Sequence, residues 1–201
     1  GTNFTDGVNT LVTGYFILVF LSLLYLSKAT GFYLDVTFVL TCLASLSVIY
    51  IFNFFGKILL GDGGAYLISF IAGVILIKFS NDNYLVSPYY IIALLWYPAY
   101  ENLFSIIRKK ILNKSPSTPD NEHLHQLIFL YFNTSFDIDK NLSNLLSGIT
   151  ICLYNLLFFF IIFDWYFFTA TLVYSVLLNV FIYNLLYFFL KTRLIKNNQN
   201  G

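Results

Sequence analysis

The feature that most constrains this chain is a series of long apolar stretches separated by short polar connectors. A helix that crosses the hydrocarbon core of a bilayer needs about 20 mostly apolar residues, with roughly 17 as the lower limit. Charged residues make up only 10% of the 201-residue chain, whereas soluble domains average about 25%. The sequence therefore predicts an all-α polytopic membrane protein with about six transmembrane helices. The expected spans are residues 8–27, 36–55, 64–79, 85–104, 142–163 and 165–190.

The positive charges fall mainly on one side of these spans when the loops are assigned alternately to the two sides. Positive charge near the ends of spans marks the cytoplasmic side. We therefore expect the N-terminus, the loops 56–63 and 105–141 and the C-terminus to be cytoplasmic. The cations on that side are Lys57, Arg108, Lys109, Lys110, Lys114, Lys140, Lys191, Arg193 and Lys196, and those on the other side are Lys28 and Lys78.

The segment GKILLGDGGAY places Asp62 among glycines at the start of the third span. A carboxylate this close to the membrane is costly unless it is paired or hydrated, so a functional role is the default interpretation. Glycine allows a sharp turn and the close approach of a ligand, and a helix that begins near Gly64 would favour a bound phosphate. The alternative is that Asp62 caps the span. Because this span is short, we expect it to be tilted or to be entered through a re-entrant turn.

The N-terminal segment NFTDGVN places Asn3, Asp6 and Asn9 at three-residue spacing. Residues three apart are neighbours on one face of a helix, so these side chains would present their oxygen atoms together if the segment is helical. The alternative is an ordinary turn and cap before an apolar run.

The segment SPSTPDNEHLHQ contains both histidines of the chain, His123 and His125. Residues two apart point about 200° apart on a helix, so both rings face one ligand only if the segment is extended or irregular, as its prolines favour. An H-x-H pair with Asp120 has zinc ligands, but no third or fourth strong ligand is adjacent. The basic run that contains Arg108 favours phosphate contacts, although such a run also anchors a membrane protein.

Carboxylates, asparagines, histidines and basic residues at one membrane surface are the groups used in phosphoryl transfer. Mg²⁺ is typically held by one or two carboxylates together with substrate phosphates. Nucleic-acid binding would need a broader basic surface, and a transporter would need ionisable groups deep inside the spans. Glu101 lies near the end of a span, and we expect it to have a structural role at the interface. The sequence thus predicts a membrane enzyme with Mg²⁺ as cofactor and no nucleic-acid partner.

Four segments together resemble a known family: NFTDGVNTL, GKILLGDGGAYLISF, YPAYENLFSIIRKK and SPSTPDNEHLHQLIF. Their order and spacing are similar to those of the polyprenyl-phosphate N-acetylhexosamine-1-phosphate transferases of glycosyl transferase family 4, which include phospho-N-acetylmuramoyl-pentapeptide transferase. The resemblance implies transfer of a sugar-1-phosphate from a UDP-N-acetylhexosamine, such as UDP-N-acetylglucosamine, to undecaprenyl (polyprenyl) phosphate, with release of UMP and a requirement for Mg²⁺. The product would initiate a cell-envelope polysaccharide such as O-antigen, lipopolysaccharide or teichoic acid at the bacterial inner (cytoplasmic) membrane.

The resemblance and the local chemistry together assign roles to individual residues. Residues 1–201 are then a single transmembrane catalytic domain, with 105–141 as its cytoplasmic substrate loop. The expected catalytic residues are Asp62, Asp6, His123 and His125, of which Asp62 also binds the metal, and the expected substrate-binding residues are Asn3, Asn9, Asp120 and Arg108.

The chain also departs from the family pattern. Asn9, Thr10 and Gln126 stand where many members have Asp, Gly and a third His, and these departures favour the alternative of a degenerate homologue that binds lipid phosphate or sugar nucleotide without turnover. Family members carry an essential Asp-Asp pair on an earlier loop, and this chain has no such pair. We therefore expect the chain to be the C-terminal part of a longer enzyme and to be inactive alone. A homodimer is a candidate assembly.

Overall fold

The computed structural model describes residues 7–113 and 122–200, with side chains as far as residue 196. Within these ranges the chain is helical and contains no strand, which confirms the all-α prediction. The helices are α1 (Leu11–Thr30), α2 (Val36–Phe54), α3 (Gly61–Asp82), α4 (Pro88–Leu94), α5 (Trp96–Ile111), α6 (Leu124–Ser135), α7 (Lys140–Ile162) and α8 (Thr169–Asn200), with a 3₁₀ turn, η2 (Phe163–Trp165), between α7 and α8.

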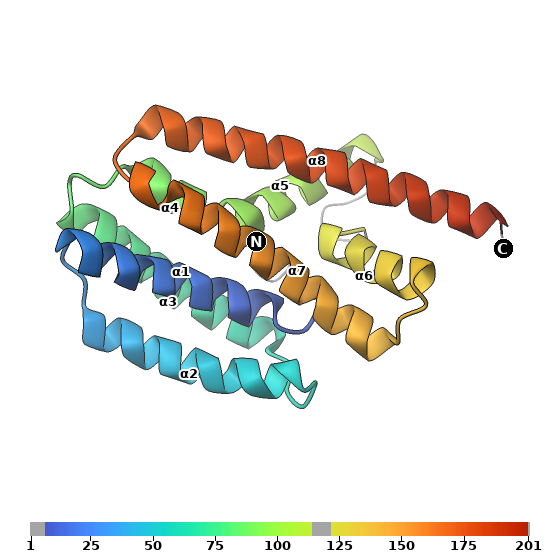
Figure 1. Ribbon diagram of the computed structural model, residues 1–201, viewed down its shortest axis with the longest axis horizontal. Helices are drawn as coiled ribbons and strands as arrows, with labels where there is room; N and C mark the ends of the chain where they lie inside the picture. The colour runs from blue at the N-terminus through green and yellow to red at the C-terminus, as the bar shows by residue number, and fades with distance from the viewer. Residues whose placement is uncertain (1–6, 114–121, 201) are drawn as a thin grey trace.

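The long helices lie side by side and form an elongated bundle (Figure 1). α1 packs against α2 and α7, while α6 packs against α7 and α8. The start of α1, the end of α2, the start of α3, the end of α5 and the start of α7 lie at the same end of the bundle, on the right in Figure 1. The described segments that carry predicted functional residues therefore lie toward one end of the bundle.

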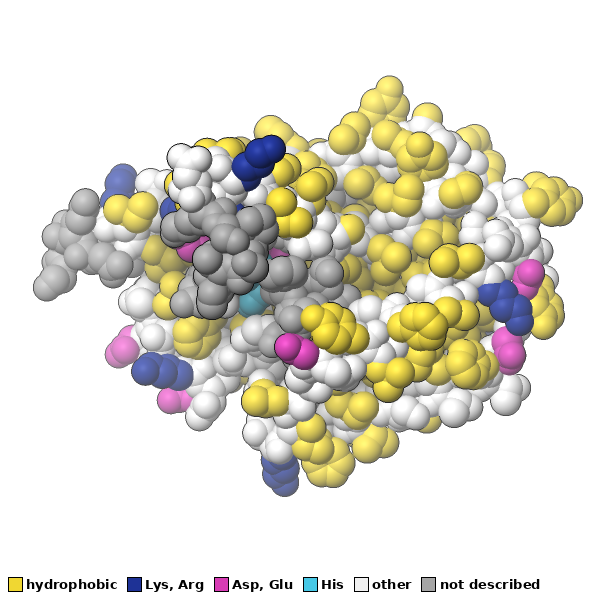
Figure 2. Space-filling model, turned by 180° about the vertical axis from the view of Figure 1, so that it is seen from behind, with side chains coloured by type: hydrophobic (Ala, Val, Ile, Leu, Met, Phe, Trp, Pro, Cys, Tyr) yellow, Lys and Arg dark blue, Asp and Glu magenta, His cyan; other side chains and the backbone are white. Residues whose placement is uncertain are grey.

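Five of the described helices are long and apolar enough to cross a membrane, and the number rises to six if α4 and α5 together form one bent span. Large apolar side chains such as Phe70, Phe160 and Tyr174 are 71%, 76% and 72% exposed. Figure 2 shows hydrophobic side chains over much of one face of the molecule, with charged side chains mainly toward its two ends. An apolar surface of this extent is expected where lipid surrounds a protein.

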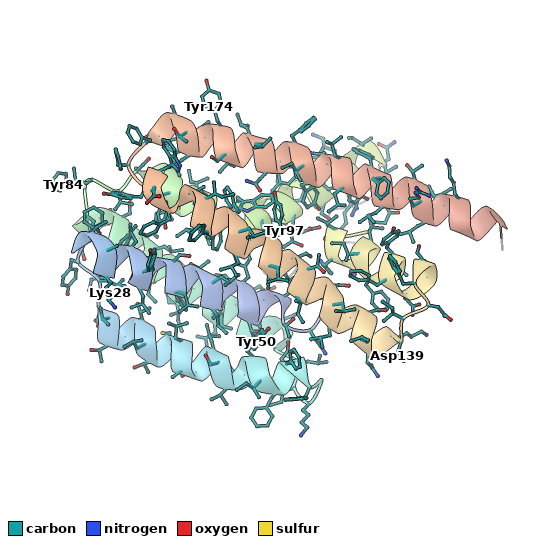
Figure 3. The ribbon with its side chains drawn as sticks, in the orientation of Figure 1. Lys28, Tyr50, Tyr84, Tyr97, Asp139 and Tyr174 are labelled. Atoms are coloured by element: carbon teal, nitrogen blue, oxygen red, sulfur yellow. The ribbon has the colours of Figure 1, made fainter. Side chains whose placement is uncertain are left out.

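The described cations are divided between the two ends of the bundle as the alternating spans require. Lys28 and Lys78 lie toward the end opposite the predicted functional segments, and Figure 3 shows Lys28 far from Asp139, the residue that precedes α7. The end of the bundle that carries the predicted functional segments is called the functional end below. The described cations at this end are Lys57, Arg108, Lys109, Lys110, Lys140, Lys191, Arg193 and Lys196.

The third predicted span is longer than expected, and the prediction of a short or re-entrant segment there is wrong. α3 begins at Gly61 and continues for 22 residues as one helix. The length was underestimated because the glycines and Asp62 were counted as part of the preceding loop, although they form the first turn of the helix.

The interruption occurs instead in the fourth span, where α4 and α5 meet at an angle of 70°. Pro98 has no backbone N–H to donate to the carbonyl four residues earlier, so a regular helix cannot continue through this point. That carbonyl, on Leu94, accepts a hydrogen bond of 2.8 Å from the Tyr15 hydroxyl of α1 instead. A packed neighbouring helix thus satisfies the backbone group that the break exposes.

Candidate functional site

Residues 7–10 form a turn, and α1 begins only at Leu11. The expectation that Asn9 lies on a helical face is therefore wrong, and the alternative of a turn before the span is correct for the described part of this motif. Thr10 has φ of 69° and ψ of −15°, a left-handed conformation that is unusual for a β-branched residue. Many members of the family that the chain resembles have glycine at this position, and Thr10 keeps a backbone conformation that glycine adopts freely.

Polar side chains from two other helices hold the turn in place. Asn53 of α2 accepts a hydrogen bond from the backbone N–H of Thr10 through its Oδ1 and donates from its Nδ2 to the carbonyl of Ile58 at 2.8 Å. Asn144 of α7 accepts from the backbone N–H of Asn9 at 2.7 Å. Strained backbone persists where its surroundings determine it, and these asparagines are the surroundings that determine the turn.

Gly148 of α7 lets the helix backbone approach the turn directly. A Cβ atom at this position would lie 2.1 Å from the carbonyl oxygen of Asn9 and 2.7 Å from Oγ1 of Thr10. No side chain fits in that space, so glycine is required by the contact between α7 and the turn.

Gly7 lies directly against His125, although the two residues are far apart in the sequence. A Cβ atom at Gly7 would lie 2.4 Å from Nε2 of His125. The structure therefore brings Gly7, the last residue of the NFTDG motif, into contact with the H-x-H motif, which neither motif could indicate from its own sequence.

The two histidines lie at the start of α6, a helix that the expectation of an irregular loop missed. His123 precedes the helix with an extended backbone (φ −74°, ψ 153°), and its backbone N–H donates to Oε1 of Gln126 at 3.1 Å. The rings of His123 and His125 are stacked, with centroids 5.5 Å apart and planes within 5°. The extended backbone that two neighbouring rings need for a shared orientation is thus present at His123.

His125 is completely buried, and within the described part of the chain neither ring nitrogen has a hydrogen-bond partner. Burial lowers the pKa of His125 to about 4, with a smaller contribution from His123 in the same direction and an opposing one from Glu101. His125 is therefore neutral near pH 7. An unpaired buried polar group costs about 1–3 kcal/mol, so a ligand that pairs with these nitrogens would remove a penalty.

Glu101 of α5 is buried beneath the histidines and is only 1% exposed. Its Oε1 lies 2.9 Å from Nδ1 of His123 and accepts a hydrogen bond of 3.2 Å from the backbone N–H of Leu124. From the sequence, Glu101 was expected to have only a structural role near the interface, and its contact with His123 was not predicted. The available indication was a carboxylate within an apolar span, a placement that favours function.

A cluster of charged groups joins α5 and α8 to the residue that precedes His123. Lys191 of α8 donates to Oε2 of Glu122 at 2.6 Å, and Arg108 donates to the Glu122 carbonyl and, at 2.6 Å, to the Tyr187 hydroxyl. The hydrogen bond from Lys191 is the main reason that the pKa of Glu122 is lowered, and Arg108 adds to the effect. The predicted contact of Arg108 with substrate phosphate stays a prediction, because its described partners belong to the protein.

Asp62 lies in the first turn of α3 and is exposed. Leu60 is the N-cap residue and no side chain caps the helix, so the alternative of Asp62 as the cap is wrong. In the described ranges Asp62 forms no hydrogen bond or ion pair, including with the histidines. A Cβ at the adjacent Gly63 would meet no atom within 4 Å, so the surface beside the carboxylate is open to a ligand.

The donor set of Asp62 fits a hard cation such as Mg²⁺, which binds through one or two carboxylates and takes further ligands from water and phosphates. The described residues contain no group of three or more His, Cys, Asp or Glu that is arranged to hold a metal ion. Asn3, Asp6 and Asp120, three of the predicted site residues, lie outside the described ranges. The metal site therefore stays a prediction.

Comparison with known proteins gives two matches. The model of glycosyl transferase family 4 matches residues 1–80. A Bacillus subtilis (strain 168) protein named "Probable undecaprenyl-phosphate N-acetylglucosaminyl 1-phosphate transferase" is 28% identical over 132 residues, which are 64% of this chain and 37% of the relative. The chain thus spans little more than a third of the length of that relative.

No solved structure matches the chain. The family match covers the turn at residues 7–10, α1, α2 and most of α3, including Asp62. The match to the relative extends over a longer part of the chain. The two findings support the same assignment, because both the family model and the relative point to glycosyl transferase family 4.

Proposed function

We propose that this chain is part of an enzyme that transfers N-acetylhexosamine-1-phosphate from a UDP-sugar to polyprenyl phosphate and releases UMP. The observation that carries the proposal is the contact between Gly7 and Nε2 of His125. It joins Gly7, the last residue of the NFTDG motif, to the H-x-H motif, and α3, which carries Asp62 in its first turn, begins at the same end of the bundle. The curated relative is named for transfer of this kind, with N-acetylglucosamine as the sugar.

In the proposed reaction, an oxygen of the lipid phosphate forms a bond to the β-phosphorus of the UDP-sugar, and the phosphoanhydride bond to UMP breaks. Positioning and electrostatic stabilisation of the phosphate oxygens supply most of the catalysis in such transfers. The chain offers neutral His125 and its neighbour His123 to hydrogen-bond substrate, and Asp62 to hold Mg²⁺. When bound, Mg²⁺ would neutralise charge on the phosphates.

The departures from the family pattern are compatible with an active site. Thr10 retains the left-handed backbone at the position where the family has glycine, with Asn53 and Asn144 holding the turn. Gln126 accepts a hydrogen bond from the backbone of His123 and so has a role in ordering the start of α6. These contacts keep the backbone geometry that the proposed transferase requires at both motifs.

The location follows from the same proposal. The functional end of the bundle carries most of the described cations, and such a bias marks the cytoplasmic side of a membrane protein. The UDP-sugar would therefore meet the lipid phosphate at the cytoplasmic surface of the bacterial inner membrane. The product would enter cell-envelope polysaccharide synthesis.

The test is a turnover assay of the full-length protein with UDP-N-acetylglucosamine, undecaprenyl phosphate and Mg²⁺. We expect one UMP for each lipid-linked sugar phosphate formed. We also expect His125→Ala to lower the rate by about 10²-fold or more, because it removes a preorganised group from the site. Binding of the UDP-sugar without release of UMP would instead identify a non-catalytic homologue.

A further inference from the structure

We propose that Glu101 is a positioning residue that fixes the tautomer and the ring orientation of His123 and thereby places the histidine pair for transfer. The inference rests on the proposed function of the site. The evidence for it is the set of contacts that Glu101 makes. Glu101 lies on α5 and was not among the residues expected to bind substrate or to take part in catalysis.

The first observation is the burial of the carboxylate. Glu101 is 1% exposed, and burying an acidic group is expensive unless other groups pair with it. Its Oε1 is shared by Nδ1 of His123 at 2.9 Å and the backbone N–H of Leu124 at 3.2 Å. The second carboxylate oxygen, Oε2, and the buried hydroxyls of Tyr97 and Tyr183 form no hydrogen bond within the described residues. The site thus contains a carboxylate held among aromatic side chains and aimed at a histidine.

The second observation determines where the proton of His123 lies. Because the backbone N–H of Leu124 can only donate, Oε1 of Glu101 acts as an acceptor. The ring nitrogen that shares this oxygen therefore donates, which places a proton on Nδ1 of His123. The hydrogen bond at one ring nitrogen sets the chemistry of the other, so Nε2 becomes the acceptor nitrogen of the His123 ring.

The third observation is that this hydrogen bond is linked to the rest of the site. Leu124 is the first residue of α6, and a carboxylate at a helix N-terminus is stabilised by the unpaired N–H groups and the helix dipole. Glu101 therefore anchors both the His123 ring and the start of α6. The His123 ring stacks on His125, and His125 lies against Gly7. A change at Glu101 is transmitted to the contact between the two motifs.

The kinetic test compares Glu101→Gln and Glu101→Asp in the full-length protein. A glutamine can present its NH₂ group to Nδ1 and so favour the wrong tautomer, while the shape of the side chain is retained. Partners that orient a metal-ligating histidine typically contribute 10- to 100-fold. We expect an orienting partner of a substrate-binding histidine to contribute a similar factor, so Glu101→Gln should lower kcat by about that much with little change in KM for the UDP-sugar. Glu101→Asp, which keeps the carboxylate, should recover part of the rate.

Two comparisons separate positioning from a general structural role. Asp139→Asn makes the same carboxylate-to-amide change at the cap of α7, where the carboxylate accepts a hydrogen bond of 2.9 Å from the N–H of Asn141; this variant should retain wild-type kcat. The double variant Glu101→Gln/His123→Ala should be no slower than His123→Ala alone, because the two residues act through one ring. Wild-type kcat in Glu101→Gln, or independent losses that multiply in the double variant, would overturn the inference.

A spectroscopic measurement of histidine protonation tests the positioning role of Glu101 separately from the proposed function. The chain has two histidines, so ¹⁵N NMR of the labelled full-length protein can report the protonation of each ring nitrogen. We expect His123 to carry its proton on Nδ1 in the wild type and to gain the Nε2–H form in Glu101→Gln. Absence of turnover in the wild type would contradict the proposed function alone. An unprotonated Nδ1 in an active wild-type enzyme would contradict the positioning role alone.

Discussion

Replacement of Asp62 by Asn is expected to lower sugar-phosphate transfer by the full-length enzyme by about 10²- to 10³-fold or more, the range found when one group that stabilises transition-state charge is lost. The carboxylate is exposed at the start of α3 and has no partner in the described part of the protein that its loss would leave unpaired. The open surface at Gly63 gives a ligand access to it. The change removes a negative charge and leaves the shape of the side chain almost unaltered, so folding and expression should be retained.

The matched control for this prediction is Asp82→Asn. Asp82 is the last residue of the same helix and is also exposed, but it lies at the opposite end of α3 from the proposed site. Its variant should transfer sugar phosphate at the wild-type rate. Turnover of Asp62→Asn at the wild-type rate would remove Asp62 from the metal site and from the mechanism.

The second large effect is expected for Gly148→Ala. The added Cβ would lie 2.1 Å from the backbone carbonyl oxygen of Asn9 and 3.2 Å from the backbone nitrogen of Leu11. Backbone atoms cannot rotate away as a flexible side chain can, so either α7 or the turn must move. Overpacking typically costs 1–3 kcal/mol, and this site should lie at the upper limit of about 3 kcal/mol. Displacement of the turn should also reduce sugar-phosphate transfer, since Gly7 belongs to this turn and lies against His125.

Gly73→Ala provides the control for this variant. Gly73 lies within α3, and a Cβ at this position would meet no atom within 4 Å. Alanine is favoured over glycine in a helix by about 1 kcal/mol, so Gly73→Ala should be neutral or stabilising. Thermal unfolding in detergent and turnover should therefore separate the two glycines. Equal stability and equal rate for both variants would show that α7 does not press on the turn.

The sequence was sufficient to predict the membrane fold, because the length and apolarity of a span are local properties. The helix boundaries and the break within the fourth span were harder to predict from the sequence. Gly61 and Asp62 read as a loop but form the first helical turn of α3, and the break between α4 and α5 depends on Pro98 together with a hydroxyl supplied by Tyr15 from another helix. The short helix α6 was missed because the prolines before it favoured an irregular loop throughout.

The candidate site was predictable in part. His123 and His125 were singled out by their residue type and spacing, and the structure places their rings together. The roles of Asn53, Asn144, Gly148 and Glu101 were not predictable, since each acts through a contact with a segment distant in sequence. An Asn or Gly within an apolar span carries no local indication of which turn it supports.

The contact between the NFTDG and H-x-H motifs is the central claim, and a solid-state NMR distance measurement tests it most directly. The full-length protein would be labelled with ¹³Cα-glycine and ¹⁵N-histidine in a lipid bilayer. The 2.4 Å between Nε2 of His125 and an ideal Cβ at Gly7, extended by a carbon–carbon bond of about 1.5 Å, predicts a Cα-to-Nε2 distance below about 4 Å. A measured distance in that range would join the two motifs in one site. Absence of any glycine Cα within about 6 Å of the His125 ring nitrogens, a limit well beyond that contact distance, would contradict the account.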